Sequence, residues 1–338
     1  MNTPAMPPSI SLRTVELSKW YSQVTALQTV TLDIEAGIWG LLGPNGSGKT
    51  TLLRLAGGLL KPSVGSIRVC GEQPFGNPRA LQHIGVCPEA DALYEDLTGL
   101  EFVSLLARLA GMGKKDALQR ATACLSELGM ADSKDRKTRT YSRGMRQRVK
   151  LAQAMVHEPK VLLLDEPLTG TDPTSRQMIL GAIRRHADRG GLVLFSTHVL
   201  HEVEALTEQM LLLVRGQLVA QGKIQDIRLL LDEYPHQVHV RCKEPRELAR
   251  QLVSIESVSA MRFSSDDTLI VDTHQPDATY AALNRQLLDH DYQLASVTSP
   301  DANLQTLFHY LVGRGDHLAG TGSDASPKSK PTPGGASS

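Results

Sequence analysis

Residues 43–50 read GPNGSGKT, which fits the pattern G-x-x-x-x-G-K-[ST] of a loop that wraps the phosphates of a nucleotide. Glycines in such a loop let backbone N–H groups approach the phosphates, because no Cβ stands in the way. We expect Lys49 to reach the β- and γ-phosphates and the Thr50 hydroxyl to ligate Mg²⁺. The predicted nucleotide-binding residues of this segment are Gly43, Pro44, Asn45, Gly46, Ser47, Gly48, Lys49, Thr50 and Thr51.

The sequence on either side of this loop predicts the elements that such a loop needs. Residues 38–42 are apolar and predict a buried strand, whereas residues 51–56 predict the first turns of a helix. The start of a helix adds about half a positive charge that faces the anion. The strand–loop–helix order therefore argues against a chance glycine loop.

A second segment that could do chemistry is the apolar run 161–164, which is followed by Asp165 and Glu166. A strand this apolar is buried on both faces, and two carboxylates buried at its end without a partner would cost several kcal/mol. A Mg²⁺ ion held by Asp165 would supply the missing positive charge. Glu166 could then act as general base on the attacking water. The alternative is a turn at a strand end with two solvated acids.

Length and composition limit the class of protein. A chain of 338 residues has room for two domains or for one large domain and an appendage, and 41% apolar residues suffice for a core. Lys plus Arg equals Asp plus Glu, at 36 each, and aromatic residues make up only 4%, so no nucleic-acid partner is expected. Four cysteines without a C-x-x-C pair indicate reduced thiols of a cytosolic protein.

Two further absences bear on membranes. No run approaches the ~18 apolar residues that a membrane-spanning helix needs, and the first residues lack the pattern of a signal peptide. We therefore expect any membrane role to come through a partner.

The main predicted unit is residues 10–231, where short apolar strands alternate with helical patterns. This order is typical of a mostly parallel sheet with helices packed on it. Residues 12–34 alternate more like antiparallel strands. At about 90–157 the pattern is helical and predicts a helical subdomain inserted in the sheet.

The remaining residues predict three further segments. Residues 1–9 are expected to be a flexible lead-in, and residues 316–338, rich in Gly, Ser and Pro, a disordered tail. Residues 235–315 are expected to form a small α/β module. Its predicted strands are 238–240, 268–271 and 295–297, and its predicted helices are 247–253, 278–288 and 304–312.

Residues 141–148 read YSRGMRQR and precede a helical run. Here the chain resembles the ATP-binding cassette (ABC) family, whose signature reads L-S-G-G-Q-R-Q-R. The resemblance covers residues 10–231 and implies a P-loop NTPase fold with an antiparallel β-subdomain and an inserted helical subdomain. It also implies roles for Tyr21 stacked on adenine, Glu89 at the Q-loop position near Mg²⁺, residues 169–173 as the D-loop, and His198 on the γ-phosphate.

In this family the signature completes a neighbour's pocket. The resemblance implies that Ser142 and the N–H groups around Gly144 face the γ-phosphate bound by the other subunit of a homodimer or heterodimer. Two ATP molecules would then be trapped between two cassettes. The alternative for His198 is an ordinary histidine at a strand end.

The chain departs from the family pattern at several motif positions. None of the replacements removes a group that would hold phosphate or metal. Arg143 either adds a cation near phosphate or points to solvent, and the sequence favours neither. The replacements are Glu89 for glutamine, Tyr141 for leucine, Arg143 for the first signature glycine, Met145 for the signature glutamine and Thr171 for the D-loop leucine.

Several segments resemble the ABC type 2 exporters, namely 84–89, 93–99, 141–145, 196–204 and 299–308. This likeness implies an ATP-hydrolysing subunit on the cytoplasmic face of the plasma (inner) membrane. ATP-dependent dimer closure would drive a separate integral-membrane permease, which would dock around residues 89–102. The alternatives are an ABC importer ATPase, whose C-terminal region is usually an all-β barrel, and a soluble ABC ATPase without a transport role.

Overall fold

The computed structural model describes residues 10–90, 93–227, 236–290 and 292–299. The predicted lead-in 1–9, the predicted helix 304–312 and the predicted tail 316–338 lie outside the described residues.

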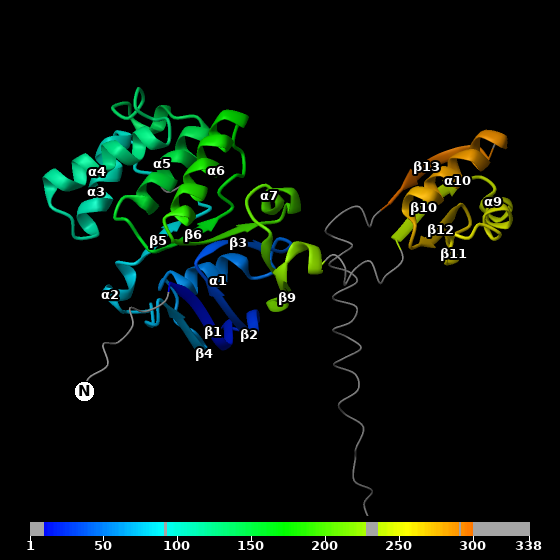
Figure 1. The fold of residues 1–338 in the computed structure, drawn as a ribbon, viewed down its shortest axis with the longest axis horizontal. Coiled ribbons are helices and arrows are strands. Elements are labelled where there is room, and N and C mark those ends of the chain that lie inside the picture. Colours follow the sequence, from blue (N-terminus) through cyan, green and yellow to red (C-terminus); the bar gives the residue numbers. More distant parts are fainter. Residues whose placement is uncertain (1–9, 91–92, 228–235, 291, 300–338) are drawn as a thin grey trace, which may run out of the picture.

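A three-stranded antiparallel sheet opens the described chain, in the order β2-β1-β4 (Figure 1). Strands β1 and β2 pair antiparallel, so the prediction of antiparallel strands over residues 12–34 is confirmed. Of the alternating residues, Leu17, Val30, Leu32 and Ile34 are buried, whereas Val15 is exposed, because the register of β1 shifts between Thr14 and Leu17. The strands are β1 (Ser11–Tyr21), β2 (Val24–Glu35) and β4 (Val64–Val69).

The central sheet has six strands in the order β5-β6-β7-β3-β8-β9, all parallel except β9. The parallel arrangement brings the carboxyl ends of β3, β6 and β7 to one edge, where the loops that follow them meet. The strands are β3 (Gly37–Leu42), β5 (Ile84–Cys87), β6 (Val161–Asp165), β7 (Leu192–Thr197), β8 (Gln209–Val214) and β9 (Gln217–Lys223).

Both faces of the central sheet are covered, as the apolar strand at 161–164 predicts. Leu162 and Leu164 pack in one core cluster with side chains of α5 and α6, whereas Leu163 packs in another with Leu52 of α1 and the β1–β2 sheet. The helices along this sheet are α1 (Lys49–Ala56), α2 (Pro78–Leu81), α5 (Arg143–Met155), α6 (Pro173–Asp188) and α7 (Leu200–Glu204).

The predicted inserted helices are present as α3 (Gly99–Leu109) and α4 (Lys114–Glu127), followed by a 3₁₀ turn at Thr138–Thr140. A reciprocal capping box of Thr98 and Glu101 fixes the start of α3. These helices pack on α5 and lie beside it at the left of Figure 1. They therefore hold the amino end of α5, which carries the signature residues.

The C-terminal part of the described chain has its own core and its own antiparallel sheet, in the order β11-β12-β10-β13. Strand β11 is absent from the sequence-based prediction because its residues are mostly exposed and give no alternation. The fold is α/β, as predicted. The elements are β10 (His236–Cys242), α9 (Pro245–Leu252), β11 (Ala260–Ser265), β12 (Thr268–Thr273), α10 (Pro276–Asp289) and β13 (Leu294–Thr298).

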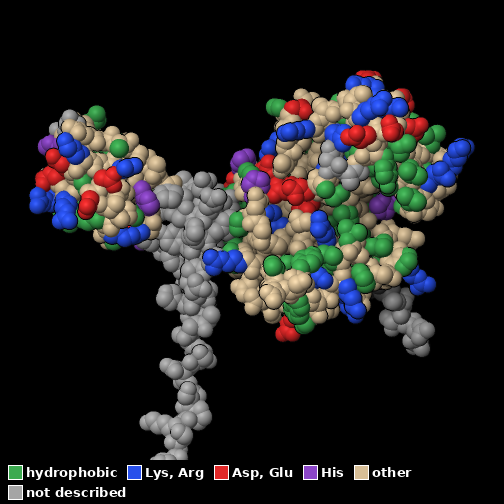
Figure 2. Space-filling view, turned by 180° about the vertical axis from the view of Figure 1, so that it is seen from behind, with side chains coloured by type: hydrophobic (Ala, Val, Ile, Leu, Met, Phe, Trp, Pro, Cys, Tyr) green, Lys and Arg blue, Asp and Glu red, His purple; other side chains and the backbone are tan. Residues whose placement is uncertain are grey.

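The distribution of charged side chains and the state of the four cysteines can be compared with what the composition predicts. Figure 2 shows Lys and Arg side chains scattered among acidic and neutral ones over the face in view. All four cysteines are buried and unpaired, and burial raises the pKa of the Cys87 thiol to about 12. Within the described ranges, no helix combines the length and the apolar character that crossing a membrane requires.

Candidate functional site

The loop at residues 43–48 joins β3 to α1 and is tied to neighbouring strand ends. Gly43 N donates to Thr197 O at 3.3 Å, and Ser47 O accepts from Gly216 N at 2.9 Å. A Cβ on Gly43 would overlap Leu213 O, and Gly48 has φ of 105°, so both positions require glycine. The loop is therefore a fixed cradle at the carboxyl edge of the central sheet.

Lys49 begins α1 and folds back over this loop. Its Nζ donates to Gly43 O at 2.7 Å and to Pro44 O at 3.1 Å, and lies 3.9 Å from Glu166 Oε1. The side chain is only 6% exposed. Burial lowers the pKa of Lys49, an effect that the nearby carboxylates, Glu166 foremost, oppose. A cation is thus held at the mouth of the loop.

Asp165 and Glu166, at the end of β6, are 5% and 9% exposed. The alternative of two solvated acids is therefore wrong. Ser196 pairs in register with Asp165 from β7. Its hydroxyl donates to Asp165 Oδ1 at 2.6 Å and accepts from Glu166 N at 2.9 Å. One hydroxyl thus fixes both acidic residues relative to the neighbouring strand.

The Glu166 carboxylate has two further partners. His198 Nδ1 lies 3.1 Å from Oε1 and 3.2 Å from Oε2, and Thr169 Oγ1 donates to Oε2 at 3.0 Å. Glu166 has φ of 48°, a left-handed conformation that costs a residue with a side chain about 1–3 kcal/mol. The turn directs this carboxylate toward Lys49 and His198, where it can accept a proton from water.

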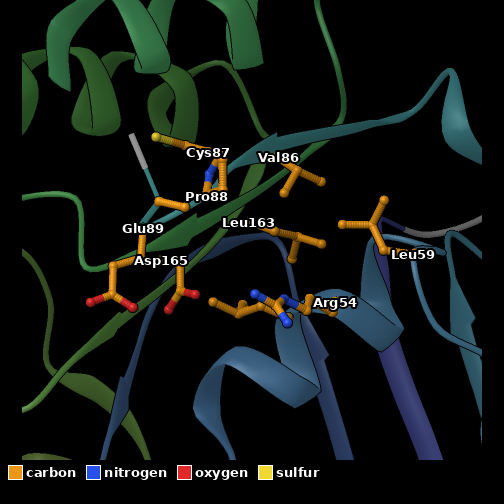
Figure 3. A pocket seen from close by; sticks show the side chains of 10 residues that line it. Arg54, Leu59, Val86, Cys87, Pro88, Glu89, Leu163 and Asp165 are labelled. Carbon is orange, nitrogen blue, oxygen red and sulfur yellow. The ribbon is translucent and has the colours of Figure 1, made fainter. Parts of the chain in front are cut away.

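Glu89 follows β5, the strand next to β6, and lines a cavity of about 370 Å³ together with Asp165. Figure 3 shows the two carboxylates side by side at one side of this cavity, with Val86, Leu163 and Leu59 forming its apolar wall. Carboxylate oxygens are the ligands that Mg²⁺ prefers. Two carboxylates alone do not complete the coordination of a cation, and Arg54 lines the same cavity, so the phosphate oxygens of a bound nucleotide would have to supply further ligands.

The residues around the loop also fit a bound phosphate group. Ser47 is 2% exposed, and its hydroxyl has no hydrogen-bond partner among the described residues. Buried hydroxyls are normally bonded, so this atom calls for an acceptor from outside the chain. The loop amides, the Lys49 ammonium and the Ser47 hydroxyl can all donate hydrogen bonds, as an anion site needs.

The signature residues lie at the start of α5. Ser142 is the N-cap and its hydroxyl accepts from Met145 N at 3.3 Å, while Arg143 is exposed beside Gly170. Gly144 is buried against α6, and a Cβ there would overlap Ser175 Oγ and Asp172 Oδ2. Among the described residues, no hydrogen bond or ion pair joins Ser142 to the 43–50 loop.

Tyr21 ends β1 with its side chain 43% exposed. The Lys19 ammonium lies 5.4 Å from the centre of the tyrosine ring. The ring is therefore available to stack on a planar ligand and has a cation beside it.

Two departures from the family pattern have structural explanations. Tyr141 is buried and its hydroxyl donates to Ser133 O at 2.6 Å, a bond that leucine could not make. The Thr171 hydroxyl donates to Leu168 O at 2.7 Å and so closes the D-loop turn.

Ser196 was not among the predicted site residues, and Thr169 was predicted only as part of the D-loop, although both contact the acidic pair. The available signal for Ser196 was a hydroxyl near the carboxyl end of an apolar strand, two residues before His198. The structure thus brings together Lys49, Asp165, Glu166 and His198.

Fold and site define a nucleotide-binding cassette, and solved structures with this fold are ATP-binding cassettes. A structure of the ATP-binding subunit of an ABC transporter is 29% identical, with a TM-score of 0.60, over 65% of this chain and 92% of its own. A dimeric ATP-binding cassette in a post-hydrolysis state, bound to ADP and Pi, has a TM-score of 0.58 over 63% and 98%. Its identity of 24% shows the fold alone.

Sequence comparison gives the family. Residues 27–169 match the family described as ABC transporter. The daunorubicin/doxorubicin resistance ATP-binding protein DrrA of Streptomyces peucetius is 32% identical over 93% of this chain and 94% of its own length. The Nod factor export ATP-binding protein I of Ralstonia nicotianae is 30% identical over 88% and 92%. The chain belongs to the ABC transporter ATP-binding proteins and is an ATPase with their fold, so the predicted fold class is confirmed.

The first prediction concerns the hydroxyl that fixes the acidic pair. Ser196→Ala leaves Asp165 Oδ1 and Glu166 N without this partner, so we expect a loss of about 1–3 kcal/mol in the free energy of unfolding and slower ATP hydrolysis. Urea unfolding and a steady-state ATPase assay measure both. Ser254→Ala, at an exposed serine, is the control, and equal behaviour of the two variants would contradict the role of Ser196.

The second prediction concerns the contact between α5 and α6. Gly144→Ala forces the two helix starts apart, so we expect about 1–3 kcal/mol of destabilisation in thermal or urea unfolding. Gly181→Ala lies within α6, where its Cβ meets only the flexible end of Arg185, and should be neutral or stabilising. Wild-type stability of Gly144→Ala would refute the close packing.

Proposed function

We propose that this chain is the ATP-hydrolysing subunit of an ABC exporter and acts on the cytoplasmic face of the plasma (inner) membrane. The observation that carries the proposal is the constellation of Lys49, Glu166 and His198 around one loop. The buried Glu166 carboxylate lies 3.9 Å from the Lys49 ammonium and 3.1 Å from Nδ1 of His198. The exporter assignment is supported by relatives named for drug resistance and for Nod factor export.

Residues 43–51 hold the triphosphate of ATP in this proposal. Loop N–H groups and Ser47 bind phosphate oxygens, and Lys49 exchanges its carbonyl contacts for the β- and γ-phosphates. Thr50 and Asp165 hold Mg²⁺, with Glu89 nearby. The ion supplies charge neutralisation at the phosphates.

Glu166 accepts the proton of the attacking water. Its buried carboxylate is oriented by Thr169 and by the backbone contact with Ser196. His198 contacts Glu166 through Nδ1 and is half exposed, so the same ring can approach a γ-phosphate. Proton transfer and phosphate sensing are thus assigned to neighbouring side chains.

Each pocket is completed by a second cassette, in a homodimer or in a heterodimer with a close relative. The support is that Ser142 and Gly144 form a helix start that no described contact joins to the 43–50 loop of the same chain. A dimer is recorded for a cassette of this fold. When two cassettes close over ATP, the nucleotide contacts the 43–50 loop of one chain and the helix start at Ser142 of the other.

The membrane partner is an integral-membrane permease that docks around residues 89–102. Tyr94 is exposed here, its ring rests edge-on against Phe102 at 5.9 Å, and its carbonyl accepts from Thr138. An exposed aromatic residue held in this way suits a short partner helix.

The proposal also includes the limits of the domains, and two alternative functions are weighed against it. We assign residues 10–231 to the ATPase domain, with the helical subdomain at about 90–157, and residues 235–315 to a separate module. The α/β character of the described part of that module speaks against the importer alternative, whose C-terminal region is usually a β-barrel. A soluble ABC ATPase is the remaining alternative.

The test of the enzymatic proposal is Glu166→Gln. The amide cannot take a proton from water, so we expect ATP binding to persist, turnover to fall at least about 100-fold and a dimer to accumulate. Nucleotide binding, phosphate release and light scattering measure the three effects. Near-normal hydrolysis would refute Glu166 as the base.

Lys49→Ala is the companion control in this test. It removes the cation of the loop and should weaken ATP binding itself, unlike Glu166→Gln. Unchanged affinity in Lys49→Ala would count against the loop as the phosphate site.

For the adenine contact, Tyr21→Ala should weaken nucleotide binding by about 1–2 kcal/mol, because a stacked ring is lost. Trp20→Ala is a matched control, since the neighbouring side chain of the same strand is equally exposed and points to the other face. Fluorescence titration with a nucleotide analogue gives both affinities. Equal affinities for Tyr21→Ala and the unmodified protein would rule out stacking.

A further inference from the structure

Helix α5 lies directly against β5, the edge strand of the central sheet. Their closest approach is at Gly85, where a Cβ would overlap the carbonyl oxygen of Ala154. Any larger residue at this position would push the helix away from the strand. The glycine therefore brings polar side chains of α5 within reach of the open edge of β5.

Side chains of α5 and of the turn that follows it contact successive carbonyls along this edge. Gln153 Nε2 donates to Val86 O at 2.8 Å, and Nε2 of His157, two residues beyond the end of α5, lies 3.1 Å from Ile84 O. Carbonyls two residues apart on a strand point the same way, so the next one, that of Pro88, extends the row. Lys150, one turn before Gln153 on α5, reaches it.

Lys150 makes the most extensive of these contacts. Its Nζ donates to Pro88 O at 3.0 Å and to Glu89 O at 2.8 Å, and lies 3.5 Å from Ala90 O. The residue is 5% exposed, and among the described residues no carboxylate lies within ion-pair distance of it. A buried ammonium has three donors and no acceptor, so these carbonyls supply its compensation.

The three carbonyls belong to the turn that carries Glu89. The Glu89 and Asp165 carboxylates line the same cavity (Figure 3), and the Glu89 carbonyl accepts from Lys150. The helix that carries Lys150 also begins at the signature, with Ser142 as its N-cap. One rigid helix thus touches both the Glu89 turn and the proposed dimer contact.

We propose that Lys150 is a positioning residue that fixes the Glu89 turn to α5 and so keeps the Glu89 carboxylate beside Asp165. The inference rests on the proposed function for the role of Glu89 near Mg²⁺. The inference concerns a residue that lies outside the phosphate loop and the acidic pair. It assigns the buried Lys150 ammonium a function beyond packing.

The first test follows the turn in the protein without nucleotide. In Lys150→Met, which keeps an unbranched apolar stem but loses the ammonium, we expect cleavage after Glu89 by a glutamate-specific protease to accelerate at least tenfold, because the turn is no longer held to α5. Gln153→Met is the matched control, because it removes one bond from the same helix to the same strand without touching Glu89. Unaltered cleavage after Glu89 in Lys150→Met overturns the inference.

The second test uses metal dependence of ATP hydrolysis. We expect Lys150→Met to raise the Mg²⁺ concentration for half-maximal activity about fivefold, with no further rise when it is combined with Glu89→Ala. Gln153→Met should leave this concentration unchanged. Additive effects of Lys150→Met and Glu89→Ala would show that Lys150 does not act through Glu89 and would also overturn the inference.

If Lys150→Met does not fold, Lys150→Gln keeps an N–H donor on a shorter, uncharged side chain and gives the same comparisons. Failure of the proposed function has a different signature. ATP binding that survives Lys49→Ala would refute the phosphate loop, whereas accelerated cleavage after Glu89 in Lys150→Met would still support the Lys150 contact.

Discussion

The site depends on how the structure compensates two carboxylates buried at the end of β6. Asp165 and Glu166 are largely shielded from bulk water there, so partners must come from elements that are distant in sequence. Ser196 of β7, Lys49 of α1 and His198 after β7 provide them. The strand order of the central sheet is therefore the condition for the chemistry, because only parallel neighbours bring these ends together.

Close approaches of backbone elements set the remaining geometry. Gly43 lets the phosphate loop lie against β8, and Gly144 lets the start of α5 lie against α6. At both positions a Cβ would overlap a neighbouring atom, so the functional parts sit at contacts with no spare volume. The helix starts and the loop are consequently held in fixed relation within the chain, and the proposed motion is assigned to the approach of a second cassette.

Local patterns in the sequence predicted much of this structure. The phosphate loop, β6 and the inserted helices follow from apolar periodicity and short motifs, and each occurs where the pattern indicates. Ser196 and Lys150 carry no such signal, since their partners are set by strand register and by helix-to-strand packing across tens of residues. Strand β11 was missed because an exposed edge strand lacks a buried face. Sequence thus identifies groups that react, whereas tertiary pairing identifies those that hold them.

The deep burial of every cysteine has a practical consequence. Burial raises the pKa of all four thiols, that of Cys87 to about 12, so almost none exists as thiolate near neutral pH. A thiolate attacks a maleimide dye or spin label only where the reagent can reach it, so labelling of the four natural thiols should be slow in the folded chain. A single cysteine introduced at the surface should therefore be labelled first, and distances between two labelled cassettes could be followed after a brief labelling reaction.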